Sequence, residues 1–584
     1  MGALQHLNKY LIKYRFKLLL GIVITIISRV FSLFAPRLIG KSLTAVEKFL
    51  QDNQGSMESL KVLMLNNILI IIGATLLSGF FTFLMRQTII NVSRYIEYDL
   101  KNEIFTHYQK LTQRFYKNNR TGDLMSRISE DVSKVRMYVG PAIMYSINTI
   151  TLFICVITIM FSIAPKLSVY TLIPLPLLSI TIYKLSRVIN ARSTVVQEML
   201  SKLSSFTQET FSGISVIKSY SLEHNTHKNF DNLALEAREK NMSLVKVQAW
   251  FFPLMILLIG LSNLIVIFIG GKQYMNGVIE IGVLAEFIIY INMLTWPVAV
   301  VGWVTSVVQQ AEASQKRINS FLNERVEIQD GSGVDQNIKG TIRFEKVTLV
   351  YPETKIKALN KISFSVESGQ TLGIIGKVGT GKSSLLNLIN RFYDPDGGKI
   401  TLDGHDIKNF KLEKLRSFIG NVPQNAFLFS ESIADNIRFG KKEVTEKEIK
   451  EASKNAAIHK NIIKFKEGYK TLLGERGLTL SGGQIQRVSI ARALIKDPKI
   501  LLFDDCLSAV DTDTEEKILR NLKSFCQNKT TIIVSHRISS VKDADHIIVL
   551  DKGNIIEDGN HQKLVNQKGF YFELFNKQQN EKQF

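Results

Sequence analysis

Six long apolar stretches in the first part of the chain constrain its fold more than any other feature. They lie near residues 18–38, 62–85, 139–163, 167–183, 247–270 and 283–307. Each approaches the ~20 residues with which an α-helix spans ~30 Å of hydrocarbon. Because the bilayer interior offers no partner for an unpaired backbone amide, stretches of this kind form helices. We therefore predict six transmembrane helices, of which the fourth is the shortest.

The charge distribution predicts how these helices are oriented. The chain has 73 Lys and Arg against 52 Asp and Glu, a net charge of +21. Segments 86–138 and 184–246 carry many of the basic residues, whereas the connections near 39–61, 164–166 and 271–282 hold few. Basic loops stay in the cytoplasm, so we expect a multi-pass protein of the cytoplasmic (inner) membrane with both termini inside. This bias also explains the net charge without a nucleic-acid partner.

Ionisable residues inside predicted spans are candidates for substrate contact. Arg29 and Glu286 are two such residues, although either could instead lie at a helix end and reach the interface. The two basic segments are predicted to be helical extensions beyond the bilayer. Breaks in the helical pattern at their far tips, within 115–131 and 208–223, predict a short transverse helix at each tip. A solvated loop without a partner is the alternative there.

A phosphate-binding loop follows in the second part of the chain. The segment TLGIIGKVGTGKSSLLNLINRF, residues 371–392, contains G-x-x-x-x-G-K-[ST] between an apolar strand and a helical pattern. Glycines let backbone N–H groups close around phosphate oxygens, and the helix N-terminus adds a positive dipole. The predicted phosphate-binding residues are Gly376, Lys377, Val378, Gly379, Thr380, Gly381, Lys382, Ser383 and Ser384. The chain is therefore predicted to bind a nucleoside triphosphate, with Mg²⁺ on Ser383.

Further polar residues follow apolar strands in the same region. Buried strands are predicted at 500–503, 531–534 and 547–550, alternating with helices, which indicates an α/β domain with a largely parallel sheet. Asp504 ends the first strand and suits Mg²⁺. Asp505 is placed to orient an attacking water, and His536 follows the second strand. Gln424 is a candidate to bridge metal and water, so the predicted catalytic set is Asp505, His536 and Gln424.

A pentapeptide makes the resemblance to a known family specific. Together with the phosphate loop, Leu480, Ser481, Gly482, Gly483 and Gln484 make the chain resemble the ATP-binding cassette transporters. Residues 474–477 (GERG) and 508–511 (SAVD) resemble the exporter subgroup. The resemblance covers nearly the whole chain, as in bacterial half-transporters that export drugs or lipids. It implies a fold of an α-helical membrane domain with six transmembrane helices, followed by an α/β P-loop nucleotide-binding domain.

The resemblance also implies how the chain works. Two cassettes close head to tail around ATP and Mg²⁺, with the phosphate loop of one facing the signature of the other. Tyr351 would stack on adenine, and Ser481 and Gly483 would contact the γ-phosphate held by the opposite chain. The two tips would be coupling helices, with Glu475 near their contact with the cassette. Asp511 and Glu475 would serve communication across the dimer.

One residue departs from the family pattern. The family usually has glutamate after the metal-binding aspartate, whereas this chain has Asp505. A side chain shorter by one methylene falls short of the water, and a misplacement of ~1 Å can cost on the order of 100-fold in rate. In the family, aspartate here is typical of one chain of a heterodimeric exporter. We favour a heterodimer for this reason, and the presence of His536 leaves a homodimer open.

The expected domains are a transmembrane domain at 1–322, a linker at 323–340, the cassette at 341–575 and a polar tail at 576–584. The expected function is ATP-driven export or flipping of a hydrophobic or amphipathic drug or lipid by alternating access. An ATP-gated channel or regulator is an alternative, and a soluble ATPase that clamps DNA is a weaker one because it has no use for apolar spans. The cargo is not readable from the sequence.

Overall fold

The chain consists of two compact units, which are described separately. The computed structural model describes residues 2–52, 57–334, 337–474, 480–507 and 512–581. The first unit contains residues 1–110 and 119–324, and the second contains residues 111–118 and 325–584. The short segment 111–118 lies between two helices of the first unit in the sequence. It nevertheless belongs to the second unit.

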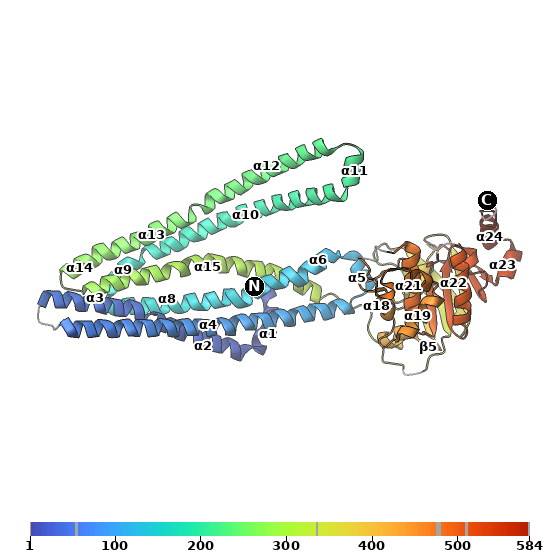
Figure 1. The fold of residues 1–584 in the computed structure, drawn as a ribbon, viewed down its shortest axis with the longest axis horizontal. Helices are drawn as coiled ribbons and strands as arrows, with labels where there is room; N and C mark the ends of the chain where they lie inside the picture. The colour runs from blue at the N-terminus through green and yellow to red at the C-terminus, as the bar shows by residue number, and fades with distance from the viewer. Residues whose placement is uncertain (1, 53–56, 335–336, 475–479, 508–511, 582–584) are drawn as a thin grey trace. The chain divides into compact units, whose positions relative to one another are not determined.

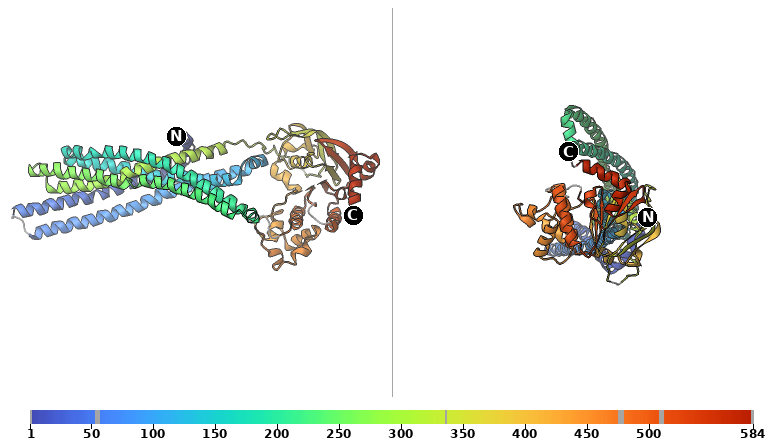
Figure 2. Two further views of the ribbon diagram at one scale, coloured as in Figure 1. Left: turned by 90° about the horizontal axis from the view of Figure 1, so that it is seen from above. Right: turned by 90° about the vertical axis from the view of Figure 1, so that its right-hand side faces the viewer.

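Long helices that run side by side build the first unit (Figures 1 and 2). They are α2 (Arg15–Ser32), α3 (Phe34–Asp52), α4 (Met57–Lys110), α8 (Ile143–Ile163), α10 (Pro174–Ser212), α12 (Glu223–Gln248), α13 (Phe251–Ile265) and α15 (Ile281–Leu322). At 1.5 Å per residue, the 54 residues of α4 extend for about 80 Å. Helices α10 and α12 pack against each other and are joined through α11 (Ile214–Ser219), as Figure 1 shows.

Shorter helices connect the long ones. They are α1 (Asn8–Lys13), α6 (Thr121–Ser126), α7 (Val132–Met137), α9 (Pro165–Leu172) and α14 (Gly271–Met275), with π-helical turns at Arg127–Asp131, Tyr138–Ala142 and Val266–Gly270. Helix α10 ends at Ser212, and Gly213 separates it from α11. The predicted helix break at this tip is therefore present in the structure.

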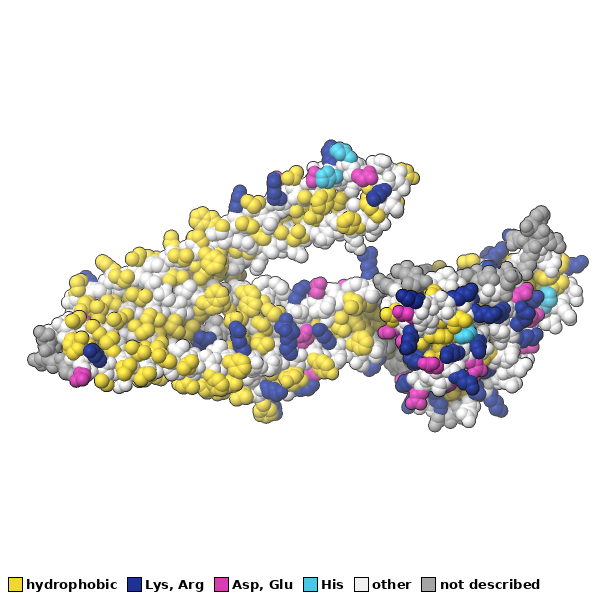
Figure 3. All heavy atoms as spheres, viewed as in Figure 1, with side chains coloured by type: hydrophobic (Ala, Val, Ile, Leu, Met, Phe, Trp, Pro, Cys, Tyr) yellow, Lys and Arg dark blue, Asp and Glu magenta, His cyan; other side chains and the backbone are white. Residues whose placement is uncertain are grey.

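The helical unit has the apolar surface of a membrane domain. In the described part of the chain, five helices are long and apolar enough to cross a membrane: Arg15–Gln51, Met57–Lys110, Thr121–Ile163, Glu223–Met275 and Ile281–Leu322. Large apolar side chains such as Ile256 and Phe268 are 70% and 77% exposed. Figure 3 shows hydrophobic side chains covering the stretches near α3, α13 and α14, while Lys and Arg gather nearer α6 and α11. Surface of this kind fits contact with lipid.

The predicted fourth span, 167–183, differs from the other five. It is helical, but it is divided between α9 and α10, and it is not among the five qualifying helices. Pro165 and Pro174 stand at the starts of these two helices. Proline is tolerated in a first helical turn because its missing N–H has no intrahelical partner there. The predicted class of a helical membrane domain followed by an α/β cassette is confirmed.

Both ionisable residues singled out within the spans have partners inside the helical unit. Glu286 is 5% exposed and accepts a hydrogen bond from the Tyr290 hydroxyl at 2.7 Å. Arg29 donates to the side-chain oxygen of Asn148. These contacts join residues within α15 and between α2 and α8. They are packing contacts of the helical unit.

The second unit holds two sheets. A four-stranded sheet has the order β2-β1-β4-β5, from β1 (Ile342–Val350), β2 (Lys357–Val366), β4 (Gly397–Leu402) and β5 (His405–Asp406). A six-stranded sheet has the order β10-β9-β3-β8-β7-β6, from β3 (Thr371–Gly376), β6 (Ile419–Val422), β7 (Ile500–Asp504), β8 (Thr530–Ser535), β9 (His546–Asp551) and β10 (Asn554–Gly559). The pairs of β3 with β8 and β9, and of β7 with β6 and β8, are parallel.

Helices cover these sheets and complete the second unit. They are α5 (Gln113–Asn118), α16 (Lys382–Ile389), α17 (Leu412–Ser417), α18 (Ile433–Arg438), α19 (Glu446–Asn455), α20 (His459–Ile462), α21 (Gly482–Leu494), α22 (Thr512–Phe525), α23 (His561–Gln567) and α24 (Phe570–Glu581). The buried core includes Leu372, Ile374, Leu502, Ile532 and Ile548 from four neighbouring strands. Because β3, β6, β7 and β8 are parallel, their carboxyl ends share one edge of the sheet, where ligands of open α/β folds bind.

Candidate nucleotide site

The phosphate loop lies between β3 and α16, as its motif predicts. Gly381 precedes α16 with φ of 99°, in the left-handed region that favours glycine. A Cβ at this position would lie 2.3 Å from the carbonyl oxygen of Ala358. No other residue fits there without moving the backbone. The loop therefore brings its N–H groups and the start of α16 close together, which is the arrangement that binds phosphate.

Lys382 is held against this loop. Its ammonium donates to the carbonyl oxygens of Gly376 and Lys377, both at 2.7 Å. Burial lowers the pKa of Lys382, while the nearby carboxylates of Asp505 and Asp504 act in the opposite direction. The cation thus sits between the loop and the acidic ends of the strands. A phosphate group bound at this point would meet a positive charge that is already in position.

Ser383 and Asp504 form the pair that suits a metal ion. The Ser383 hydroxyl donates to Oδ1 of Asp504 at 2.9 Å, which joins the start of α16 to the end of β7. Burial raises the pKa of Asp504, and the Asp505 charge raises it further, whereas Ser383 and Lys382 lower it. A hydroxyl and a carboxylate side by side are the oxygen ligands that Mg²⁺ prefers. The residues present therefore fit this cation.

Asp505 and His536 lie in contact across the parallel strands. Nδ1 of His536 lies 2.9 Å and 3.0 Å from the two carboxylate oxygens of Asp505. The Asp505 amide donates to the carbonyl of Val534, so the pairing of β7 with β8 continues to this residue. Asp505 has φ of 45°, a conformation in which Asp is enriched among non-glycine residues. The structure thus brings together two of the three predicted catalytic residues.

The C-terminal helix contributes a contact that the sequence did not reveal. The side-chain amide of Gln578, on α24, donates to the carbonyl of His536 at 2.8 Å and accepts from the amide of Ile538 at 2.8 Å. These two bonds hold the backbone on both sides of Arg537, at the His536 carbonyl and at the Ile538 amide. The Arg537 guanidinium pairs in addition with buried Glu515 at 2.8 Å. The segment carrying His536 is therefore fixed from α22 and α24.

Tyr351, the predicted adenine contact, is linked to the phosphate loop. Its hydroxyl lies 2.9 Å from Oγ of Ser384, and its ring meets the Tyr393 ring edge-on with centroids 5.2 Å apart. The Lys117 ammonium, on α5, lies 5.9 Å from the Tyr351 ring centroid and 5.6 Å from that of Tyr393. A cation at this distance is attracted to an aromatic face. Segment 111–118 thus reaches the predicted adenine site within the second unit.

Ion pairs anchor the same segment. Arg114 pairs with Glu327 at 2.5 Å and with Glu353 at 3.2 Å. Thr112 adds a hydrogen bond to Glu327 at 3.1 Å. Helix α5 begins at Gln113, two residues before the predicted tip 115–131, and a second short helix, α6, follows it. The first part of this predicted tip therefore has partners in the cassette unit, unlike a solvated loop.

The signature residues open α21. Ser481 is the N-cap: its hydroxyl accepts from the Gln484 amide at 3.4 Å, while the Gln484 side chain accepts from the Ser481 amide at 3.0 Å. This capping box fixes the helix start. Leu480 is buried, whereas Ser481 and Gly482 are exposed and Gly483 is half-buried. Such a helix start presents N–H groups to an anion from outside the chain.

The remaining predicted residues are Gln424, Glu475 and Asp511, of which the structure describes Gln424. Gln424 follows β6, whose pairing with β7 brings it to the site's edge of the sheet. Its backbone carbonyl accepts from Gln486 of α21, and its exposed side chain bonds none of Ser383, Asp504 and Asp505 in the described part of the chain. Glu475 and Asp511 lie outside the described residues. Their suggested part in dimer communication stays a prediction.

Fold and site together define a membrane protein with an ATP-binding cassette. Residues 18–298 match the model for the ABC transporter transmembrane region, and residues 359–508 match the ABC transporter model. The chain belongs to the ABC transporter family. It joins a multi-pass membrane domain and one ATP-hydrolysing cassette in a single polypeptide, which makes it a half-transporter. Half-transporters of this family function as dimers.

Similar proteins agree over the full length. The chain is 35% identical over 580 residues to the multidrug resistance-like ATP-binding protein MdlA of Buchnera aphidicola subsp. Schizaphis graminum, which covers 99% of this chain and 98% of that protein. It is 34% identical to the probable multidrug resistance ABC transporter ATP-binding/permease protein YheI of Bacillus subtilis, with the same coverage. A solved bacterial Atm1-family ABC exporter with ATP bound has a TM-score of 0.80 at 26% identity, covering 97% of this chain and 99% of that one.

Proposed function

We propose that this chain is one half of a dimeric exporter that uses ATP to move hydrophobic or amphipathic molecules, drugs or lipids, out of the cytoplasm. One observation carries the proposal most directly. Residues 111–118, inserted between helices of the membrane unit, belong to the cassette unit and are bound there by Arg114. A change in the cassette is thereby transmitted along the chain into α4 and α6. The multidrug names of the relatives support the same function.

In this proposal each residue of the nucleotide site has a definite task. Tyr351 stacks on adenine, and the loop Gly376–Ser384 surrounds the phosphates, with Lys382 on the β- and γ-phosphates. Exposed Ser481 and the helix start at Gly482 and Gly483 bind the γ-phosphate held by the partner chain. ATP then bridges the two chains, and its cleavage releases them. Alternation between inward- and outward-facing states follows from this cycle.

Hydrolysis needs a positioned water and a metal ion. Ser383, Asp504 and Gln424 would hold Mg²⁺, which supplies charge neutralisation on the phosphates. Asp505 accepts a proton from the attacking water as the water oxygen bonds to the γ-phosphorus. The bond from that phosphorus to the ADP oxygen breaks, so ADP and phosphate leave. His536 orients the groups around Asp505, with which it is in contact.

Asp505 supports a heterodimer. Its carboxylate is one methylene shorter than glutamate, and both of its oxygens face Nδ1 of His536. Both features reduce its reach toward a water, so we infer that this chain's own site turns over slowly. Its LSGGQ segment then completes a fast site on a glutamate-bearing partner. A homodimer with two slow sites is the alternative.

The basic segments 86–138 and 184–246 support an orientation with both termini and the cassette in the cytoplasm. The coupling role of 115–131 and 208–223, and the domain limits 1–322, 323–340, 341–575 and 576–584, are parts of the same proposal. A soluble clamp ATPase does not fit the part of the chain that the structure describes, which has five helices long and apolar enough to span a membrane. An ATP-gated channel is the second candidate, because the architecture of the family by itself does not distinguish a channel from an exporter.

ATP-dependent accumulation in inside-out membrane vesicles tests the proposal. Vesicles from cells in which the chain forms its dimer should accumulate at least one dye from a panel of amphipathic dyes against its gradient. Lys382→Ala vesicles should not. Hydrolysis of ATP with an ion current and without accumulation of any dye would favour the channel.

A further inference from the structure

A cavity inside the helical unit has the shape and lining of a ligand site. Its volume is about 540 Å³, and its walls come from α8, α10 and α15. Ligand pockets commonly have volumes of about 300–1,000 Å³. Helices α10 and α15 approach closely beside it, where a Cβ on Gly302 would lie 3.0 Å from the Ser186 hydroxyl. All of its lining residues belong to this chain.

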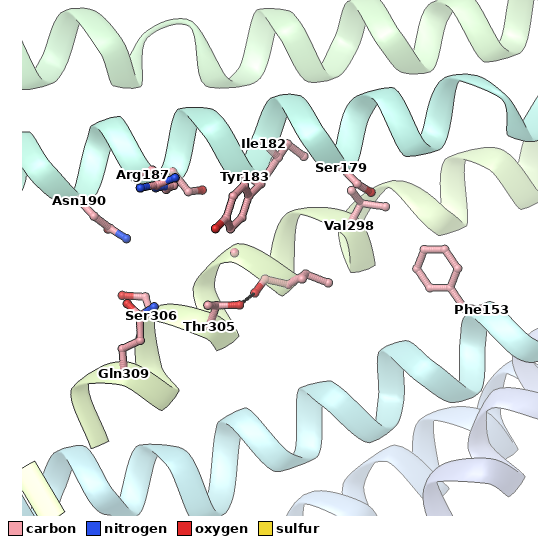
Figure 4. A pocket seen from close by; sticks show the side chains of 13 residues that line it. Phe153, Ser179, Ile182, Tyr183, Arg187, Asn190, Val298, Thr305, Ser306 and Gln309 are labelled. Carbon is pink, nitrogen blue, oxygen red and sulfur yellow. Dashed lines mark hydrogen bonds between the residues drawn. The ribbon is translucent and has the colours of Figure 1, made fainter. Parts of the chain in front are cut away.

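The lining changes from apolar to polar along the cavity. Figure 4 shows Phe153, Ile182 and Val298 toward one end, and Arg187, Asn190, Ser306 and Gln309 toward the other. The polar side chains come from two different helices, α10 and α15, and converge across the space between them. An occupant with an apolar body and a polar head therefore fits in one direction only.

Arg187 decides the charge of that head. It is the one charged side chain among the lining residues that the structure describes. In the described part of the chain it forms no ion pair, and its guanidinium lies 6.0 Å from the Tyr183 ring centroid. Arg187 is an exposed residue, so an acidic group in the cavity can reach its guanidinium. A guanidinium binds carboxylate, sulfonate or phosphate groups in a bidentate manner, with Asn190 and Gln309 able to donate beside it.

We propose that this cavity is a cargo site selective for amphipathic acids, with the acidic head on Arg187 and the apolar body along Phe153, Ile182 and Val298. The proposal rests on the proposed export function, whose cargo class it specifies. The two ionisable residues singled out within the predicted spans, Arg29 and Glu286, do not line the cavity. The acid is either a free amphipath or the head of an anionic lipid, since both present the same group.

A matched pair of fluorescent probes tests the selectivity. The purified full chain in nanodiscs of zwitterionic phosphatidylcholine is titrated with dansylaminoundecanoic acid and with its methyl ester, which lacks the charge. We expect the wild type to bind the acid about tenfold more tightly, because a charge-assisted hydrogen bond is worth more than a neutral one. Arg187→Gln should remove this preference, and Arg187→Lys should restore part of it.

Lys184→Gln is the control. Lys184 is exposed one turn before Arg187 on α10 and does not line the cavity, so its neutralisation should keep the tenfold preference. Nanodiscs containing phosphatidylglycerol separate the two sources. Competition that depends on Arg187 identifies an anionic lipid as the occupant, whereas its absence identifies a free amphipathic acid.

Equal affinity of the wild type for acid and ester would overturn the proposal, as would a preference that survives Arg187→Gln. Binding to one chain requires neither hydrolysis nor a partner. A negative result here together with dye accumulation in vesicles would therefore remove the acid selectivity alone. Failure of accumulation with intact acid binding would instead remove the export function.

Discussion

The nucleotide site and the cargo cavity are built in opposite ways. The nucleotide site stands at one edge of a parallel sheet, where β3, β7 and β8 end, and short contiguous runs supply its residues. The cavity takes single side chains from α8, α10 and α15, and Phe153 and Gln309 are far apart in the sequence. Contiguous motifs can specify the chemistry that a whole family shares. Cargo preference, which depends on scattered single side chains, can instead be altered by one substitution at a time. Substitutions in the first site should therefore be severe for every cargo, and those in the second graded and cargo-dependent.

The largest effect is expected for Lys382→Ala. Lys382 is the cation that the loop holds beside Asp504 and Asp505. Removing one preorganised charged donor from phosphate should lower ATPase activity by about 100-fold to 1,000-fold. Acid-probe binding in the cavity should not change. ATPase assays and probe titrations on the same preparation measure both. Full ATPase activity in a preparation without a partner chain would contradict the site assignment.

Substitutions at Asp505 and Ser481 distinguish the two nucleotide sites of the dimer, because Asp505 serves this chain's own site and Ser481 completes the site of the partner. If the partner carries glutamate, Asp505→Asn should lower the activity of the assembly only modestly, whereas Ser481→Arg should be severe because it blocks the partner's γ-phosphate. Asp505→Glu should raise the activity of the chain purified alone by about tenfold or more. Robust activity of the wild-type chain alone, lost with Asp505→Asn, would contradict the heterodimer.

A smaller effect is expected from filling the polar end of the cavity. Ser306→Leu adds apolar volume opposite Arg187 and Asn190, which should exclude the acidic head and weaken acid binding by about tenfold. ATP affinity should stay at the wild-type value. Val307 is the next residue along α15, is buried and does not line the cavity. Val307→Ile is therefore a control that also adds apolar volume to α15, and it should leave acid binding unchanged. Unchanged acid affinity in Ser306→Leu would place the head elsewhere.

The smallest effect is expected for Gln578→Ala. This change removes two neutral hydrogen bonds of about 1 kcal/mol each that hold the backbone around His536. The kcat of ATP hydrolysis should fall about fivefold, while the KM for ATP stays the same because no phosphate contact is lost. Gln579→Ala, at the exposed next position, should leave both constants unchanged. A rise in KM alone would assign α24 to nucleotide binding instead.

The sequence predicts the nucleotide site better than the cavity for a physical reason. Lys382, Asp504 and His536 follow buried strands, and parallel strands bring their carboxyl ends together, so local patterns suffice. The sequence does not predict the role of Gln578, because that role depends on where α24 docks. It does not predict Arg187 as a cavity residue either, because the face that a long helix presents depends on tertiary packing. The polar lining of the cavity has no contiguous signal at all.

Local sequence patterns also leave features of the membrane unit unpredicted. Among the described residues, five of the predicted apolar stretches lie in helices long and apolar enough to cross a membrane, whereas 167–183 is divided between α9 and α10 and is not among them. The attachment of residues 111–118 to the cassette unit was not predicted either, since it depends on Arg114 meeting Glu327 and Glu353. Neither carboxylate is near Arg114 in the sequence. Such long-range pairs carry no local pattern.

The most direct test measures whether the two sites are coupled. The affinity of the dansyl acid is measured in nanodiscs containing the dimer that the chain forms in its membrane, with and without ATP. If ATP binding drives the cargo site outward, the acid affinity should fall at least about tenfold in the wild type, a coupling of about 1.4 kcal/mol, and not at all in Lys382→Ala. An acid affinity that ATP leaves unchanged in the wild type would contradict the account.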